Sequence, residues 1–418
     1  FAVQDRGTKS DCQQMPQLDM RRATAVSLAQ LGSPPKERWS MESHRVSICS
    51  SRVVGICLLT ALTLPPTLHA EPYFAFREGY KCSTCHVNKT GGGKRNEFGS
   101  SFTQTEFSPI LEAASKNSLD FSADIGESFS LGMDFMIVHE TLFSVEESID
   151  DGNEVYEQGA ENSFDIRSGN LYLEAQLVPE ILTLYLDETV SPAGASNREA
   201  FVLYDNLPHG GYVKAGRMLL PYGIRLWDDD AFIRQVTGFN YDNQDLGFEV
   251  GVEPSMFSLS LAVSNGTQGA RDGNTSKQIS STGSVLIDNF VVGSSFSLNK
   301  SRGIVRTLFG PYAAVRTGPL TLMGEADWID ESPGGQQFVF YSSVELWLRE
   351  SVNVRAAFDY WDPFDEISED ERSRVSVGVN AFLTPSLEAS AYYKMKESVP
   401  QDVPGNADAL TLSLHSFF

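Results

Sequence analysis

A period-two alternation of apolar and polar residues runs through this chain from about residue 130 to its end. Between residues 320 and 328, for example, Leu322 and Trp328 share one face, while Glu325 lies on the other. Such alternation is typical of β-strands, in which successive side chains point to opposite faces. A soluble sandwich would bury the apolar face, whereas a transmembrane barrel turns it towards lipid. Alternation alone leaves both folds open.

The connections between the predicted strands separate these two folds. Seven connections are very short turns, and those at the opposite ends of the strands are mostly longer and polar. Seven turns and eight loops join sixteen strands and place both ends of the sheet on the turn side. Short turns opposite long loops are typical of outer-membrane barrels. The predicted turns are 179–180, 207–210, 254–255, 288–289, 317–318, 350 and 384–385, and the predicted loops are 144–162, 190–198, 220–244, 266–277, 301–303, 330–335, 362–371 and 398–406.

We therefore predict a mainly β chain, in which residues 119–418 form a transmembrane antiparallel β-barrel of about 16 strands. The last strand agrees, because Leu410, Leu414 and Phe418 form one face and end the chain on an aromatic residue, as in the assembly signal of outer-membrane barrels. A barrel of this size encloses an interior wide enough for water or for a plug. The expected location is the outer membrane of a bacterial cell, with its lipid as one partner.

The N-terminal region predicts export from the cytoplasm. Residues 41–70 have the pattern of a secretory signal peptide, with basic residues, an apolar stretch of about a dozen residues and Ala70 at the cleavage point. We expect residues 1–40 not to belong to the native chain, the alternative being a disordered extension. Cleavage after Ala70 would leave Cys82 and Cys85 as the remaining cysteines.

The chain is strongly acidic. It carries 32 Lys and Arg against 55 Asp and Glu, for a net charge of −23. Residues 1–70 contain eight of the basic and five of the acidic residues, so their removal leaves a net charge of −26. This charge argues against nucleic acid as a partner and favours cations. Acidic loops such as 228–230 would either attract divalent metal ions or simply be solvated, and both interpretations stay open.

Residues 71–118, between the signal peptide and the barrel, contain the sequence CSTCH at 82–86. Two cysteines separated by two residues and followed by histidine form the attachment pattern of a c-type haem. A thioredoxin-like pair would need a βαβ setting, which is lacking, and a zinc site would need four ligands. We therefore predict one covalently attached haem c, bound by Cys82 and Cys85, with His86 as the ligand of its iron.

The segment around this motif is too small to fold on a core of its own, so the haem would serve as its core. Lys94 and Arg95 either pair with haem propionates or form a solvated turn. The sixth ligand of the iron stays open, and the candidates are His415, His209 and Met218. Six aromatic residues either wrap the porphyrin or pack on the barrel wall: Phe74, Phe76, Tyr80, Phe98, Phe102 and Phe107.

The sequence PYFAFR at 72–77, the motif at 82–86 and the barrel together resemble the outer-membrane cytochrome–porin fusions of iron-oxidising and other electron-exchanging bacteria. The resemblance implies that Cys82, Cys85 and His86 carry the haem, with the haem segment entering from the periplasmic side. It implies electron transfer between an extracellular donor or acceptor, such as Fe(II), and periplasmic carriers such as soluble cytochromes. Whether the chain is an Fe(II) oxidase, and in which direction electrons flow, stays open.

Two other functions compete with electron transfer. The barrel would be a solute channel, or porin, if the haem segment served as a plug or a sensor. A soluble periplasmic cytochrome built on a β-sandwich is disfavoured by the difference between turns and loops. The redox potential and the oligomeric state are not predicted by the sequence.

Overall fold

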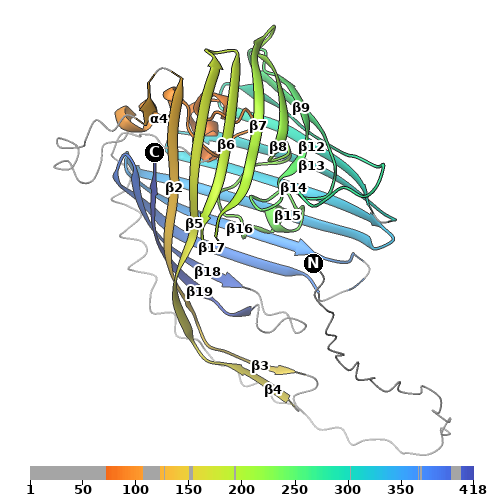
Figure 1. Cartoon of the computed structure of the whole chain (residues 1–418). Coiled ribbons are helices and arrows are strands. Elements are labelled where there is room, and N and C mark those ends of the chain that lie inside the picture. The colour runs from red at the N-terminus through yellow and green to blue at the C-terminus, as the bar shows by residue number, and fades with distance from the viewer. Residues whose placement is uncertain are drawn as a thin grey trace, which may run out of the picture. The chain divides into compact units, whose positions relative to one another are not determined.

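The computed structural model of the chain contains a closed antiparallel β-barrel and an N-terminal helical segment (Figure 1). It describes residues 72–106, 123–126, 128–149, 154–192, 194–301, 303–365, 367, 370–396 and 406–418, without the side chains of 103–106, 145–149 and 154–158. The predicted extension at 1–40, the signal peptide at 41–70 and Phe107 lie outside these residues.

Sixteen strands form the barrel wall, and each pairs with its neighbours in sequence until β19 closes the ring on β2. The predicted sixteen-strand barrel is therefore confirmed. The strands of the wall are β2 (Phe129–Leu142), β5 (Glu161–Val178), β6 (Leu182–Ser191), β7 (Ser196–Leu207), β8 (Gly211–Met218), β9 (Asp245–Val252), β10 (Phe257–Ser264), β11 (Gln278–Ile287), β12 (Phe290–Ser301), β13 (Ile304–Thr317), β14 (Leu320–Ser332), β15 (Gly335–Arg349), β16 (Val352–Asp362), β17 (Arg372–Thr384), β18 (Leu387–Lys396) and β19 (Ala409–Phe417).

Within the described residues, three short strands and four helices accompany the wall. Strand β1 (Asp124–Ile125) pairs with the start of β2, and β3 (Val145–Ile149) pairs with β4 (Glu154–Gln158) in a separate hairpin between β2 and β5. The helices are α2 (Pro72–Glu78), α3 (Cys82–Cys85), α4 (Glu97–Glu106) and α6 (Phe232–Gln235). None of the helices in the described part of the chain is long and apolar enough to cross a membrane.

The seven predicted short turns all connect successive strands at one end of the barrel, which we call the turn side. The turn between β7 and β8, for example, has positive φ angles of 64° at both His209 and Gly210. At the other end, the prediction of a longer loop over 330–335 is wrong, because β14 and β15 stay paired as far as Glu331 and Gly335. The polar residues there continue the strands, so their polarity alone did not mark a loop.

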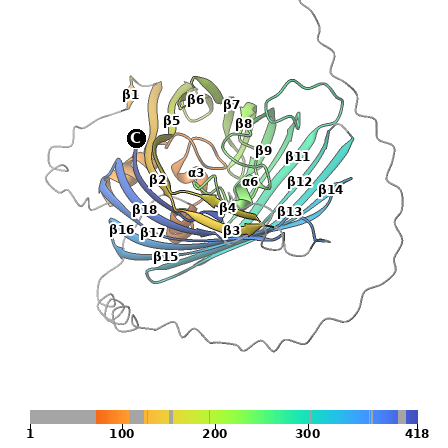
Figure 2. The same ribbon diagram turned by 90° about the horizontal axis from the view of Figure 1, so that it is seen from below.

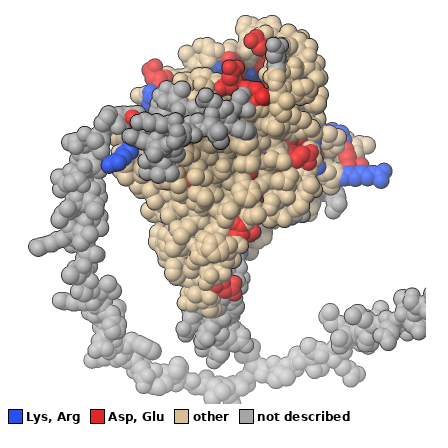
Figure 3. Space-filling model, turned by 60° about the vertical axis from the view of Figure 1, so that its left-hand side comes forward, with Lys and Arg blue, Asp and Glu red and all other residues tan. Residues whose placement is uncertain are grey.

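The wall is apolar outside and polar inside. On β9 and β10, Phe248 is 48% exposed and Leu259 is 54% exposed on the outer face, while Glu249 and Ser260 are buried on the inner face. In the space-filling view, most of the visible outer surface of the wall consists of residues other than Lys, Arg, Asp and Glu (Figure 3). An apolar exterior around a polar lumen is the arrangement of a barrel that spans a bilayer.

The long connection between β8 and β9, residues 219–244, folds into the barrel. Its apolar residues Leu226 and Ile233 are almost completely buried. The Tyr222 hydroxyl donates to Asp327 of β14 at 2.7 Å, and the Phe232 amide donates to Asp359 of β16 at 3.1 Å. Seen from below, α6 lies within the ring of strands (Figure 2). This connection therefore fills part of the lumen.

Candidate functional site

The N-terminal segment, residues 72–106, lies in the turn-side mouth of the barrel. The Lys81 ammonium donates to the backbone oxygens of Glu253 at 2.9 Å and Phe257 at 2.7 Å, beside the turn between β9 and β10. The guanidinium of Arg77 lies 4.8 Å from the ring centre of Trp347 on β15. Because these contacts involve strands in different parts of the barrel wall, they hold the segment across the mouth.

A buried polar network fixes the middle of this segment to the wall. The Asn88 amide donates to the Glu199 carboxylate at 3.0 and 3.2 Å, and its oxygen accepts from Lys214 at 3.0 Å. Lys214 also pairs with Glu249 at 2.9 Å, and both of these side chains are fully buried. Buried charges are costly unless they are paired and hydrogen-bonded. Asn88 therefore couples the segment to strands on one side of the lumen.

Lys94 belongs to a second anchor. Its ammonium pairs with Glu174 of β5 at 3.0 Å, and its backbone amide donates to the Tyr185 hydroxyl at 2.9 Å. Gly93, with φ of 66°, has no room for a side chain because Tyr185 lies against it. Lys94 is thus committed to the wall, so the expected pairing of this residue with a haem propionate does not fit the structure.

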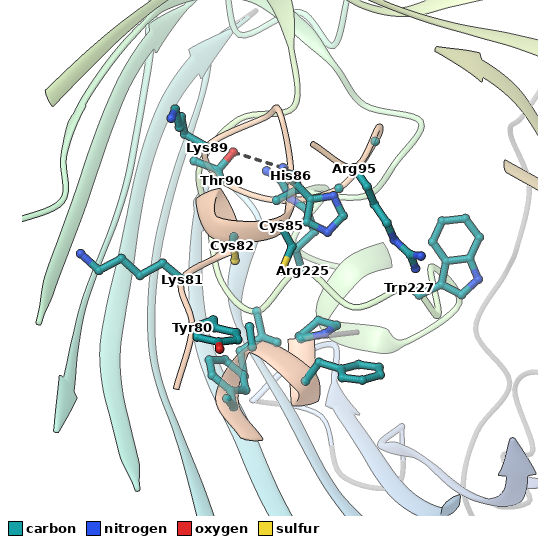
Figure 4. A pocket seen from close by; sticks show the side chains of 18 of the residues that line it. Tyr80, Lys81, Cys82, Cys85, His86, Lys89, Thr90, Arg95, Arg225 and Trp227 are labelled. Atoms are coloured by element: carbon teal, nitrogen blue, oxygen red, sulfur yellow. Dashed lines mark hydrogen bonds between the residues drawn. The ribbon is translucent and has the colours of Figure 1, made fainter. Parts of the chain in front are cut away.

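The CSTCH motif faces a cavity of about 240 Å³ inside the turn-side mouth (Figure 4). Cys82, Cys85 and His86 all line this cavity. The two cysteines lie on one face of α3 because they are one helical turn apart. The His86 amide donates to the Cys82 oxygen at 3.1 Å, and an isolated β-bridge joins His86 to Arg95.

The motif residues are in a state that suits haem attachment. Both cysteines are free thiols, and Cys82 is exposed to the cavity. The Nδ1 atom of His86 is buried and has no hydrogen-bond partner among the described residues. Desolvation, with a smaller contribution from Arg95, lowers the pKa of His86 to about 4, so the imidazole is neutral. A neutral imidazole with an unsatisfied nitrogen has the chemistry of a metal ligand.

Aromatic side chains from the segment and from the wall surround the cavity. Three of the six predicted aromatics line it, namely Phe74, Phe76 and Tyr80. Phe98 and Phe102 do not line the cavity, and their ring centres lie 5.6 and 6.0 Å from that of Tyr80. The wall and the connection 219–244 contribute further rings that the sequence analysis did not place beside the motif: Tyr172, Trp227, Tyr241, Tyr312, Phe382, Phe417 and Phe418.

The three candidates for a sixth ligand lie in different places. His415 lines the cavity, but its Nε2 is 2.8 Å from Asp134 and its Nδ1 is 3.7 Å from Glu388. His209 is exposed in the turn between β7 and β8, and Met218 is completely buried. The fold therefore brings His415 alone of the three to the cavity wall, with both ring nitrogens directed at carboxylates.

Two residues of the in-folded connection were missed by the sequence reasoning. Arg225 donates to the Gly91 oxygen at 2.6 Å and to the Leu220 oxygen at 3.0 Å, and so it ties the N-terminal segment to residues 219–244. Trp227 stacks on the His415 ring with 5.1 Å between centres. The sequence did contain a signal that this connection folds inward, because 219–227 contains an apolar run that is unusual for a solvated loop. Within the described residues, no cluster of three or more His, Cys, Asp or Glu side chains is arranged to hold a metal ion.

Solved structures similar to this chain are outer-membrane proteins. A loop-deletion mutant of OmpT from Vibrio cholerae matches with a TM-score of 0.52 and 10% identity, over 70% of this chain and 100% of that one. An anion-selective porin from Comamonas acidovorans gives 0.51 and 11%, over 70% and 99%. OmpF of Salmonella typhi in complex with daunomycin gives 0.52 and 11%, over 70% and 98%.

The barrel has the porin fold. At 10–11% identity this likeness is one of fold alone. No protein-family model matches the sequence, and no curated protein matches it.

Proposed function

We propose that this chain is an outer-membrane barrel of the porin fold that holds one covalently attached haem c in its turn-side mouth and moves electrons across the membrane. The observation that carries this proposal is the meeting of Cys82, Cys85 and His86 at one cavity inside the lumen. The two thiols would bind the porphyrin, and His86 would ligate the iron. When bound, a haem c supplies reversible one-electron chemistry.

The position of the cavity supports electron transfer. The apolar band of an outer-membrane barrel is about 25 Å tall, so a haem held inside the lumen would lie nearer to the opposite surface than a haem outside the mouth. The segment, the wall and the connection 219–244 line the cavity together, and their aromatic rings give it apolar surface. The neutral His86 imidazole needs no deprotonation before it binds iron.

The partners follow from the resemblance and from the charge of the chain. We expect an extracellular donor or acceptor, with Fe(II) as the first donor to test, and periplasmic carriers such as soluble cytochromes on the other side. The turn side would face the periplasm, because short turns do so in outer-membrane barrels. A net charge of −23 for the whole chain would attract cations such as Fe(II).

A solute channel is the second candidate function, and the porin fold favours it more directly than electron transfer. In this case residues 72–106 would act as a plug or a sensor at the mouth. The connection 219–244 would narrow the lumen further. Both functions share the same barrel, so the haem and the permeability must be measured on one preparation.

The experiment uses the full chain produced with cytochrome c maturation and reconstituted in liposomes that enclose an electron acceptor. External Fe(II) should reduce the enclosed acceptor, while solutes of a few hundred daltons stay excluded. A Cys82→Ser/Cys85→Ser variant should lose both the covalent haem and the electron transfer, and Thr84→Ala, inside the same motif, should keep both. Free passage of solutes without haem-dependent reduction would establish the channel and reject electron transfer.

A further inference from the structure

Four lysine and arginine side chains of the described residues line the cavity, and three of them already have partners. Lys81 donates to two backbone oxygens of the wall, Lys89 pairs with Asp205, and Arg225 donates to the backbone of the in-folded connection. Arg95 is the fourth. Its guanidinium makes no hydrogen bond or ion pair with any described residue.

The environment of Arg95 holds it in place without using its donors. The guanidinium carbon lies 4.1 Å from the ring centre of Phe417, so the group rests on an aromatic surface. The backbone bridge between Arg95 and His86 holds the main chain of Arg95 beside the CSTCH motif. Two carboxylates attract it through space, Asp134 and Glu388, but both of these contact His415. Five N–H donors thus remain for a ligand.

We propose that Arg95 binds a carboxylate in this cavity and that, in the haem-loaded protein, this carboxylate is a haem propionate. The inference rests on the proposed function for the source of the carboxylate. An unpaired charge inside a protein is costly, and a guanidinium matches a carboxylate with two parallel hydrogen bonds. Arg95 belongs to the same short segment as Cys82, Cys85 and His86, and Figure 4 shows its side chain extending along the cavity towards Trp227.

The test compares haem-loaded wild type with Arg95→Gln and with Lys89→Gln, which removes one cavity-lining charge that is already paired. Removal of a positive charge beside a propionate should favour oxidised iron and raise the proton affinity of the propionate. Arg95→Gln should change the reduction equilibrium constant by up to about tenfold, which is about 59 mV for one electron. It should also move the pH dependence of the potential to higher pH, while Arg95→Lys should recover part of both effects.

A second arm identifies the source of the carboxylate. The haem-free Cys82→Ser/Cys85→Ser variant is placed in planar bilayers, and its conductance is compared in potassium propionate and potassium chloride, with and without Arg95→Gln. A potential shift in the first arm supports a haem propionate. An Arg95-dependent difference in the second arm alone assigns the site to a small anionic solute and overturns the haem assignment. The proposal is overturned altogether if Arg95→Gln behaves like Lys89→Gln in the first arm and leaves the conductance of the haem-free variant unchanged in the second.

A failure of the proposed function would look different. If the wild-type chain carried no covalent haem after maturation, the first arm would have no reduction potential to measure. The conductance arm would still test whether Arg95 binds a carboxylate.

Discussion

Asn88 shows how one side chain can fix the N-terminal segment, residues 72–106, to the barrel. It donates to a carboxylate and accepts from an ammonium, so an amide is the group that satisfies both neighbours. The Glu199 carboxylate also accepts from the Leu219 amide at 2.8 Å, where the in-folded connection begins. The N-terminal segment, the barrel wall and the in-folded connection therefore meet at the buried Glu199 side chain.

We predict that Asn88→Asp loosens the segment, because it places a second carboxylate against Glu199. A buried group left without its partner costs about 1–3 kcal/mol, and 1.4 kcal/mol corresponds to about a tenfold change in an equilibrium constant. Protease cleavage within residues 72–106 should therefore become about tenfold faster in detergent-solubilised protein. The double variant Asn88→Asp/Glu199→Gln exchanges donor and acceptor and should restore protection. Equal cleavage of wild type and Asn88→Asp would contradict the assigned role.

The connection 219–244 depends on charge pairs with the wall. Asp228 lies 3.3 Å from Arg374 and 3.8 Å from Lys394. Burial by itself would raise the pKa of Asp228, but Lys394 and Arg374 outweigh that effect and hold it well below its usual range. A lowered native-state pKa means that the stabilisation is present above about pH 4 and is lost only as the pH falls through the lowered value.

We therefore predict that Asp228 keeps its pairs with Arg374 and Lys394 between pH 7 and pH 4. A change of conductance over this range would come from other groups, such as Asp229 of the same connection, whose pKa burial raises to about 6. Asp228→Asn should weaken the anchor at every pH in the range and give a larger or noisier single-channel conductance. Asp242→Asn makes the same change of charge at an exposed position of the same connection and serves as the control. An unchanged conductance in Asp228→Asn, or the same change in both variants, would show that the pairs do not hold the connection.

At the scale of the whole molecule, the apolar outer face of the barrel predicts that lipid surrounds it. Leu261, near the middle of β10, is 43% exposed on the outer face and pairs across the sheet with Val250 and Ser281. A barrel that spans a bilayer presents such a residue to hydrocarbon. A barrel in water would present it to solvent, where an added charge costs little.

We predict that Leu261→Arg reduces the yield of folded barrel in lipid vesicles, because an arginine at the bilayer midplane costs about 2–4 kcal/mol. Thr275→Arg, in the exposed connection between β10 and β11, should fold as the wild type does. The fraction folded at equilibrium in urea, measured in vesicles, distinguishes them. If the two variants had the same stability, the outer face would not be in contact with lipid.

The strands, their order and the side of each turn could be predicted because the information is local. Alternation in β10 or β14 depends on successive residues, and turns such as 207–210 are marked by their own residue types. The same holds for CSTCH, whose chemistry is contained in five consecutive positions. The misjudged connection at 330–335 marks the limit of such local information, since polar residues suit both a loop and a strand that extends beyond the lipid.

By itself, the sequence determined a sixteen-strand barrel and the two thiols and histidine suited to a haem. The tertiary structure decided which side chains surround that motif, that Lys94 pairs with the wall while Arg95 keeps its donors, and that residues 219–244 turn inward. The physical reason is the distance along the chain between partners. Closure of the barrel joins Asn88 to Glu199 and Lys94 to Glu174 across 111 and 80 residues, and no local pattern records such contacts.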